Sequence, residues 1–340
     1  MSRAMHQMPV ETGRVMQCRG EAPSQPSSDE AHLPRQGSED AGRRLLEQVV
    51  AKENMQRAWK RVKANKGAAG VDGLDIDQTE SHLRQVWPSI RQQLLMGTYQ
   101  PLSVRRVCIP KPDGSERELG IPSVTDRLIQ QALLQVLQPL IDPSFSEHSH
   151  GFRPGRRAWD AVLSAQRYAQ EGYCIVVDVD LSRFFDRVNH DILIDRLRRQ
   201  VNDTGVIRLV RAYLNAGIMD GGVVVERLEG TPQGGPLSPL LANVLLDAVD
   251  KELERRGHRF ARYADDCNVY VRSQKAGERV MALLKRCYDK LRLKINESKS
   301  AVAGVFGRSF LGYCLWQNRD GEVRRGVSKK ALEAFKQRIR

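Results

Sequence analysis

The sequence lacks any apolar run long enough to cross a bilayer, which would need roughly 18 or more residues. It also lacks the short apolar core found near the start of a secretory signal peptide. Its six cysteines show neither the close pairs of a zinc finger nor the pattern of a secreted disulfide framework, and no segment is repeated. We therefore expect a soluble cytoplasmic protein with reduced thiols and no contact with membranes.

The sequence has the composition of a globular protein and an excess of positively charged residues. Its 340 residues are 41% hydrophobic, enough for one large domain or two ordinary ones. Lys and Arg number 54 against 41 for Asp and Glu, a formal net charge of +13. Such a charge favours a polyanionic partner, with nucleic acid as the first candidate. Because the charges are scattered along the chain, a merely solvated basic surface is the alternative.

The chain divides into a polar leader and a patterned remainder. Residues 1–44 are rich in Ser, Pro, Gln, Gly and charge, with too little apolar material to offset the entropy of ordering, so we expect a disordered leader. Beyond it, the spacing predicts helices over 41–62, 78–96, 126–138, 158–169, 236–255, 277–291 and from 328 onward, with Asp126 and Ser328 as N-caps. Strands are predicted over 104–110, 118–121, 173–180, 301–305 and 310–315, with a pair of strands over 259–271.

Three carboxylates stand where predicted strands end. Asp180 follows an apolar strand, and Asp265 with Asp266 occupies the tight turn of a hairpin. If the hairpin pairs beside the first strand, the three acids converge, and like charges at close range repel unless a cation neutralises them. Mg²⁺ suits such oxygen ligands, and two such ions can assist a phosphoryl transfer. An Asp-Asp pair in a turn is by itself more often structural than catalytic.

Several long motifs occur in a fixed order, and together they resemble the reverse-transcriptase domain of group II intron-encoded proteins over about residues 50–330. These motifs are Ile109–Gly114, Gly120–Arg127, Gly151–Arg156, Asp178–Asp186, Gly230–Pro239, Arg262–Asp266, Leu293–Lys299 and Phe310–Tyr313.

The resemblance implies an α+β fold of the right-hand polymerase type, in which a palm of antiparallel strands is backed by helices and the fingers are mostly helical. It implies fingers over 45–170, a palm with the catalytic site over 171–327, and only the start of a helical thumb over 328–340. Because the family continues into a full thumb, and often into DNA-binding and nuclease domains, we expect this chain to be C-terminally truncated.

The resemblance also implies an RNA-directed DNA polymerase that adds dNTPs to the 3′-hydroxyl of a DNA or RNA primer on an RNA template, with intron RNA and a maturase role in addition. It assigns the metal ligands to Asp180, Asp265, Asp266 and the main-chain carbonyl of Leu181, holding two Mg²⁺ ions or Mn²⁺ in their place. Asp178, two residues before Asp180 on the same strand face, is interpreted as a supporting residue.

Other positions take family roles in the same way. Lys299 is the candidate donor of a proton to pyrophosphate, with Lys294 as the alternative. Phe185 resembles the steric gate that excludes a 2′-hydroxyl, while Phe184 is the one of the two expected to be only a core residue. Lys111 and Arg117 match the triphosphate contacts, Gln233 the contact to the incoming nucleotide, and Phe310, Leu311, Gly312 and Tyr313 the primer grip.

Two features keep other hypotheses open. Glu118 stands where the family has a proline, so a carboxylate follows the proposed phosphate contact Arg117 and could weaken nucleotide binding. The expected truncation leaves room for a non-catalytic RNA-binding splicing factor or an inactive remnant of a mobile element. An RNA-templated RNA polymerase is a further alternative, which the aromatic ring of Phe185 disfavours.

Overall fold

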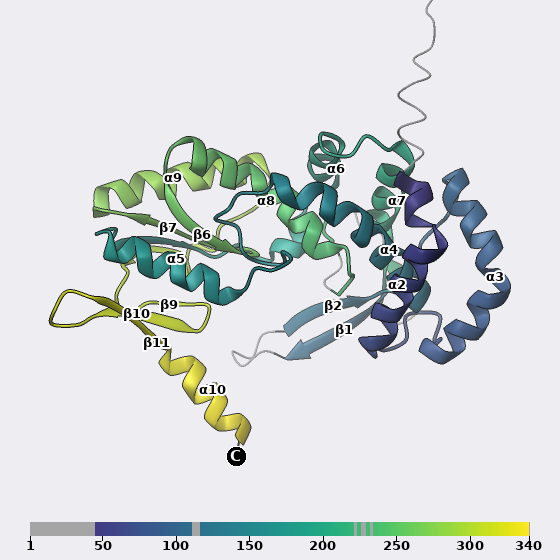
Figure 1. The fold of residues 1–340 in the computed structure, drawn as a ribbon, viewed down its shortest axis with the longest axis horizontal. Helices are drawn as coiled ribbons and strands as arrows, with labels where there is room; N and C mark the ends of the chain where they lie inside the picture. The colour runs from purple at the N-terminus through teal and green to yellow at the C-terminus, as the bar shows by residue number, and fades with distance from the viewer. Residues whose placement is uncertain (1–44, 111–115, 221–222, 226–228, 232–233, 340) are drawn as a thin grey trace, which may run out of the picture. The chain divides into compact units, whose positions relative to one another are not determined.

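The computed structural model describes residues 45–110, 116–220, 223–225, 229–231 and 234–339 (Figure 1). The predicted disordered leader, 1–44, lies outside the described residues. Among the described residues, no helix is long and apolar enough to cross a membrane.

A four-stranded antiparallel sheet carries the candidate catalytic acids. Its strand order is β6-β7-β3-β8, so strands distant in sequence lie side by side. Val179 of β3 pairs with Cys267 of β7, which brings the end of β3 next to the β6–β7 turn. The antiparallel palm implied by the sequence motifs is confirmed. The strands are β3 (Ile175–Val179), β6 (Arg259–Tyr263), β7 (Asp266–Val271) and β8 (Ala301–Gly304).

Helices cover both faces of this palm sheet, and the alternation of strand side chains decides which residues each helix meets. On one face, Val176 and Tyr270 pack with residues of α5 (Ala158–Gln170). On the other face, Val177 and Val269 join the main core with residues of α8 (Ser238–Arg255) and α9 (Gln274–Lys290). Asp178 and Asp266 share the strand parity of the α5 face, so their carboxyl groups start from the same side of the sheet.

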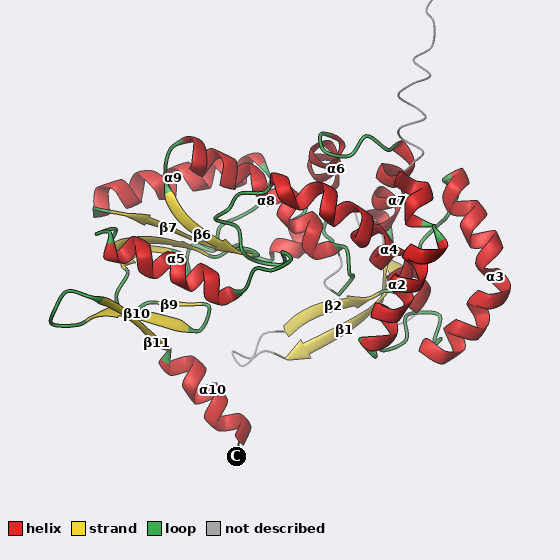
Figure 2. Cartoon of the chain, viewed as in Figure 1, coloured by secondary structure: helices red, strands yellow, loops and turns green. Residues whose placement is uncertain are grey.

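A second sheet, with strand order β2-β1-β4-β5, lies among helices of the fingers (Figure 2). β1 pairs with β2 in an antiparallel hairpin and with β4 in parallel, through Val104 and Ile218. The strands are β1 (Val104–Pro110), β2 (Glu116–Ile121), β4 (Ile218–Asp220) and β5 (Val223–Val225). The helices in the same part of the chain are α2 (Lys52–Ala64), α3 (Ile76–Met96), α4 (Val124–Ile141), α6 (His190–Arg198) and α7 (Thr204–Asn215).

Contacts between the described elements cross the predicted boundary between fingers and palm at residue 170. α5 belongs to the predicted fingers but packs on the palm sheet, whereas β4 belongs to the predicted palm but pairs with β1. The chain therefore passes from palm to fingers and back between β3 and α8. The helices α6 and α7 and the strands β4 and β5 were not predicted.

The start of α4 differs from the prediction, because Ser123 and not Asp126 is the N-cap. The Ser123 hydroxyl accepts a hydrogen bond from the backbone N–H of Asp126. Asp126 is instead a buried acceptor for the hydroxyl groups of Tyr99 (2.8 Å) and Tyr213 (3.2 Å) and for the backbone N–H of Leu102 (3.2 Å). An acid at the third helical position thus joins α4 to two distant segments, the loop at 99–102 and α7, while Ser123 caps the helix.

A small third sheet leads to the last helix. Its order is β11-β10-β9, and the backbone N–H of Ala331 donates to the Ser328 hydroxyl at 3.2 Å, which confirms Ser328 as a cap. The elements are β9 (Ser309–Phe310), β10 (Tyr313–Gln317), β11 (Val323–Val327) and α10 (Lys329–Ile339).

Candidate active site

The β6–β7 turn presents two of the three acids. Tyr263 pairs with Asp266, which leaves Ala264 and Asp265 as a two-residue turn. Ala264 has a φ of 58°, in the left-handed region that such tight hairpin turns use. Gly151 lies directly behind the turn: a Cβ at this position would stand 2.2 Å from the Ala264 nitrogen, so the close approach requires glycine.

A buried arginine holds this turn from the inside. Arg262 is completely buried, and its guanidinium donates to both carboxylate oxygens of Asp250, at 2.6 Å for the shortest contact. It also donates to the side chains of Asn243 (2.9 Å) and Ser149 (2.8 Å) and to the carbonyl of Ala264 (2.8 Å). All five N–H groups of the guanidinium thereby have acceptors. The turn backbone is fixed to α8 and to the loop that contains Ser149.

The third acid, Asp180, is positioned through its backbone. Its N–H donates to the Ser300 hydroxyl (3.0 Å), and its carbonyl accepts from the backbone N–H of Asn296 (2.8 Å). Leu181 bridges to Ile295 in the same segment, and the flanking hydrogen bonds do not use the Leu181 carbonyl. Asp180 directly follows Val179, which pairs with Cys267 of β7, so its backbone lies beside the hairpin.

Asp178 has different partners from Asp180. Its carboxylate forms an ion pair with Arg308 at 2.7 Å. The side-chain amide of Asn268 lies 3.0 Å from its other oxygen and donates to it when the amide nitrogen faces that oxygen. A carboxylate held by a guanidinium and an amide is well suited to supporting the site, in keeping with the interpretation of Asp178 as a supporting residue.

The electrostatics of the site are those of acids that repel one another. Neighbouring protein atoms exclude part of the water around the Asp266 carboxylate, and this desolvation is the largest cause that raises its pKa to about 6. The charges of Asp265, Asp180 and Asp178 raise it further, and the side chain still reaches solvent. Such mutual repulsion favours binding of a cation. The described residues contain no ready group of three or more His, Cys, Asp or Glu side chains around one ion position. The donors still suit Mg²⁺ in kind, because Mg²⁺ is commonly bound by one or two carboxylates completed by substrate phosphates and water.

Phe184 and Phe185 follow in the short helix η2 (Phe184–Arg187). Phe184 is buried in the core, while Phe185 is half-buried with its ring centroid 5.0 Å from that of Phe184. The backbone N–H of Thr231 donates to the Phe185 carbonyl at 2.8 Å. The expectation that Phe184 is a core residue is confirmed, and Phe185 is the ring that remains accessible.

The other predicted contacts are only partly described. Lys111, the side chain of Arg117 and Gln233 lie outside the described residues. Lys299 is exposed and precedes Ser300, the residue bonded to Asp180. Glu118 forms an ion pair with Arg106, so its carboxylate has a basic partner within the fingers sheet.

The predicted primer-grip residues form a second tight turn. Phe310 pairs with Tyr313, and Leu311 and Gly312 between them have φ angles of 52° and 85°. The Tyr313 ring meets the Trp159 ring edge-on at a centroid distance of 5.4 Å. Trp159 therefore packs against this turn, which agrees with its interpretation as a packing residue.

Sequence reasoning missed the supporting residues Arg262, Asp250, Arg308 and Ser300. Only Arg262 carried a usable signal, because a charged residue between apolar neighbours in a predicted strand needs a buried counter-ion. The other three are brought to the site by contacts that no local pattern marks.

We expect Asp250→Ala to lower the free energy of unfolding by about 3–5 kcal/mol, because it leaves the Arg262 charge buried without its counter-ion. Urea denaturation measures the change. The matched control is Asp195→Ala, whose partner Arg199 is 71% exposed; a surface pair of this kind contributes less than about 1 kcal/mol. Equal losses in the two variants would contradict the structural role given to Asp250.

Comparison with known proteins places these observations in a family. The family model for reverse transcriptase (RNA-dependent DNA polymerase) matches residues 109–315. Protein YkfC of Escherichia coli K12 is 32% identical over 329 residues, which cover 83% of this chain and 85% of YkfC. Group II intron-encoded protein LtrA of Lactococcus lactis subsp. cremoris is 28% identical over 85% of this chain and 59% of LtrA.

A solved structure is also similar. A chain of a partial Cas6-RT-Cas1-Cas2 complex is 27% identical, with a TM-score of 0.46 over 72% of this chain and 42% of that one. This chain therefore spans most of YkfC but less than two thirds of LtrA.

Proposed function

This chain belongs to the reverse transcriptase (RNA-dependent DNA polymerase) family, and from this we propose that it copies RNA into DNA by extending a primer with dNTPs. The observation that supports the proposal is the pairing of β3, which Asp180 follows, with β7 beside the β6–β7 turn that contains Asp265 and Asp266. Template RNA, a DNA or RNA primer and dNTPs are the proposed partners, and the net charge of +13 supports a polyanionic ligand.

In the proposed reaction, the primer 3′-oxygen bonds to the α-phosphorus of the dNTP as the bond from that phosphorus to pyrophosphate breaks. Asp180, Asp265, Asp266 and the Leu181 carbonyl would hold Mg²⁺, or Mn²⁺, which supplies charge stabilisation at the attacking and leaving oxygens. The three carboxylates orient the reacting groups, and the hydroxyl proton leaves toward water. Lys299, on the segment bonded to Asp180, is the proposed proton donor to pyrophosphate.

Primer extension on an RNA template tests the carboxylates directly. We expect Asp180→Asn and Asp265→Asn each to lower the extension rate by on the order of a thousandfold, because several kcal/mol of charge stabilisation depends on them. The matched control is Asp289→Asn, an exposed aspartate on α9, which should retain the rate. An extension rate in Asp265→Asn equal to that of the parent chain would contradict the proposed chemistry.

The two neighbouring phenylalanines should respond differently to truncation. We expect Phe185→Ala to raise the use of NTPs relative to dNTPs by on the order of tenfold or more, since its accessible ring is the proposed barrier to a 2′-hydroxyl. Phe184→Ala should leave that ratio alone and cost about 3–5 kcal/mol of stability instead, because Phe184 is buried. An unchanged NTP-to-dNTP ratio in Phe185→Ala would remove the gate from the proposal.

Binding of intron RNA with a maturase role is a second proposed function, supported by the similarity to group II intron-encoded protein LtrA. Splicing of a group II intron RNA, followed with and without the protein, measures it. We expect Asp265→Asn to support splicing as well as the parent chain does, because RNA binding does not need the catalytic acids. A splicing rate that is the same with and without protein would refute this role.

A further inference from the structure

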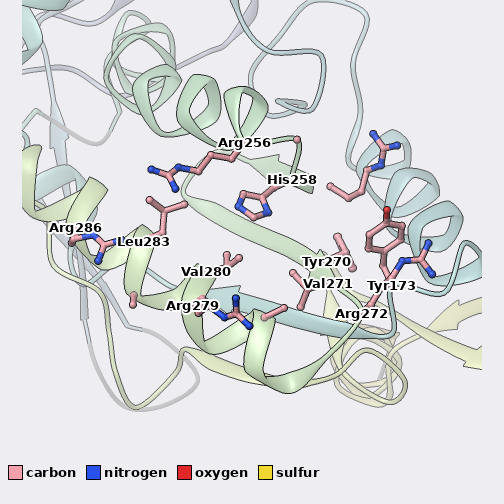
Figure 3. A pocket seen from close by; sticks show the side chains of 14 residues that line it. Tyr173, Arg256, His258, Tyr270, Val271, Arg272, Arg279, Val280, Leu283 and Arg286 are labelled. Atoms are coloured by element: carbon pink, nitrogen blue, oxygen red, sulfur yellow. The ribbon is translucent and has the colours of Figure 1, made fainter. Parts of the chain in front are cut away.

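The palm sheet has a basic hollow at the end away from the catalytic turn (Figure 3). It has a volume of about 540 Å³ and is lined by the end of α8, the start of β6, the end of β7 and one side of α9. Five of the fourteen lining residues are arginines and none is acidic. The arginines are Arg256, Arg259, Arg272, Arg279 and Arg286.

Four of these five guanidinium groups have no anionic partner among the described residues. Arg256 pairs with Glu252, but the other four form no ion pair within the described part of the chain. All five side chains are exposed, and Arg272 lies over the Tyr173 ring with its guanidinium carbon 4.4 Å from the ring centroid. Gathering like charges without counter-ions is unfavourable, so a bound polyanion would stabilise this arrangement.

The hollow is separated from the active site by the length of the strands. Arg259 begins β6 and Tyr263 ends it, so at about 3.3 Å per residue the two positions lie about 13 Å apart. Arg272 follows β7, whereas Asp266 begins that strand. A ligand in this hollow therefore does not occupy the place of the primer terminus or of the dNTP.

The spacing of the arginines favours an extended ligand over a single phosphate ion. Arg279 and Arg286 stand two helical turns apart on α9, about 10 Å along the helix axis. In Figure 3 the hollow is lined by Arg256 after α8, by Arg272 after β7 and by the two arginines of α9. Guanidinium groups bind phosphate oxygens through paired hydrogen bonds, and successive phosphates of one strand can engage several of them.

We propose that this arginine hollow binds the phosphodiester backbone of a nucleic-acid strand at a site separate from the polymerase active site. The proposal concerns binding alone and does not depend on catalysis. RNA and DNA share the phosphodiester backbone, and comparing the binding of the two shows which nucleic acid the hollow binds.

The test compares two double variants of α9 that remove the same charge. Arg279→Gln/Arg286→Gln removes two lining arginines, whereas Lys275→Gln/Lys290→Gln removes two exposed lysines outside the hollow. Binding of a fluorescein-labelled single-stranded RNA, and of DNA with the same sequence, is measured by anisotropy over a range of salt concentrations. Because all four side chains are exposed, the urea midpoint should be the same for both variants and the parent chain.

We expect the arginine variant to bind the RNA on the order of tenfold more weakly, with the slope of log affinity against log salt reduced by about 1.4 for two lost phosphate contacts. The lysine variant should stay within about twofold of the parent chain. A larger loss of affinity for RNA than for DNA assigns the site to RNA, and equal losses of affinity show that it binds both nucleic acids. Equal weakening in the arginine and lysine variants, or none in either, would overturn the proposal.

The same binding measurement in the Asp265→Asn background separates this proposal from the catalytic one. We expect the effect of the arginine substitutions to persist there, because the hollow and the β6–β7 turn lie at opposite ends of the strands. Extension of a short primer–template at saturating concentration should proceed at the parent rate in the arginine variant. Loss of extension with unchanged RNA binding would count against the hollow as a separate site.

Discussion

A guanidinium without access to water fixes the backbone turn on which the candidate chemistry depends. Arg262 connects Asp250 and Asn243 of α8, Ser149 of the loop before α5 and the Ala264 carbonyl through one rigid, planar group. A buried charge costs several kcal/mol unless it is paired, so this network forms only when all of its partners are assembled together. Assembly of the turn is thereby linked to formation of the palm core.

Two acids on the same face of the palm sheet nevertheless have different environments. Asp178 and Asp180 begin on the same face of the sheet, but Arg308 pairs with Asp178, while Asp180 is held through its backbone. Partial burial, and next the repulsion from Asp265, Asp180 and Asp178 at the same end of the sheet, raise the pKa of Asp266 to about 6. The proposed Mg²⁺ would relieve that repulsion, which links stabilisation of the site to the reaction proposed for it.

The two ends of the β6–β7 hairpin carry opposite charges. Asp265 and Asp266 lie at the turn, whereas Arg259 and Arg272 lie at the open end beside α9. The proposed active site and the proposed backbone-binding hollow are therefore held at a set separation by the same two strands. A nucleic acid that engages both would be guided by a rigid sheet, which orients a ligand better than a loop does.

The sequence by itself determined most of the helices and strands, though not α6, α7, β4 or β5. Among those it determined are the apolar strand that leads to Asp180 and the hairpin that carries Asp265 and Asp266, because these depend on local spacing and on motifs along the chain. It did not reveal that Asp126 is a buried acceptor, that β4 pairs with β1, or that α5 covers the palm sheet. Nor did it reveal the arginine hollow. Each of these results from contacts between residues distant in the chain, and only the tertiary structure brings those residues together.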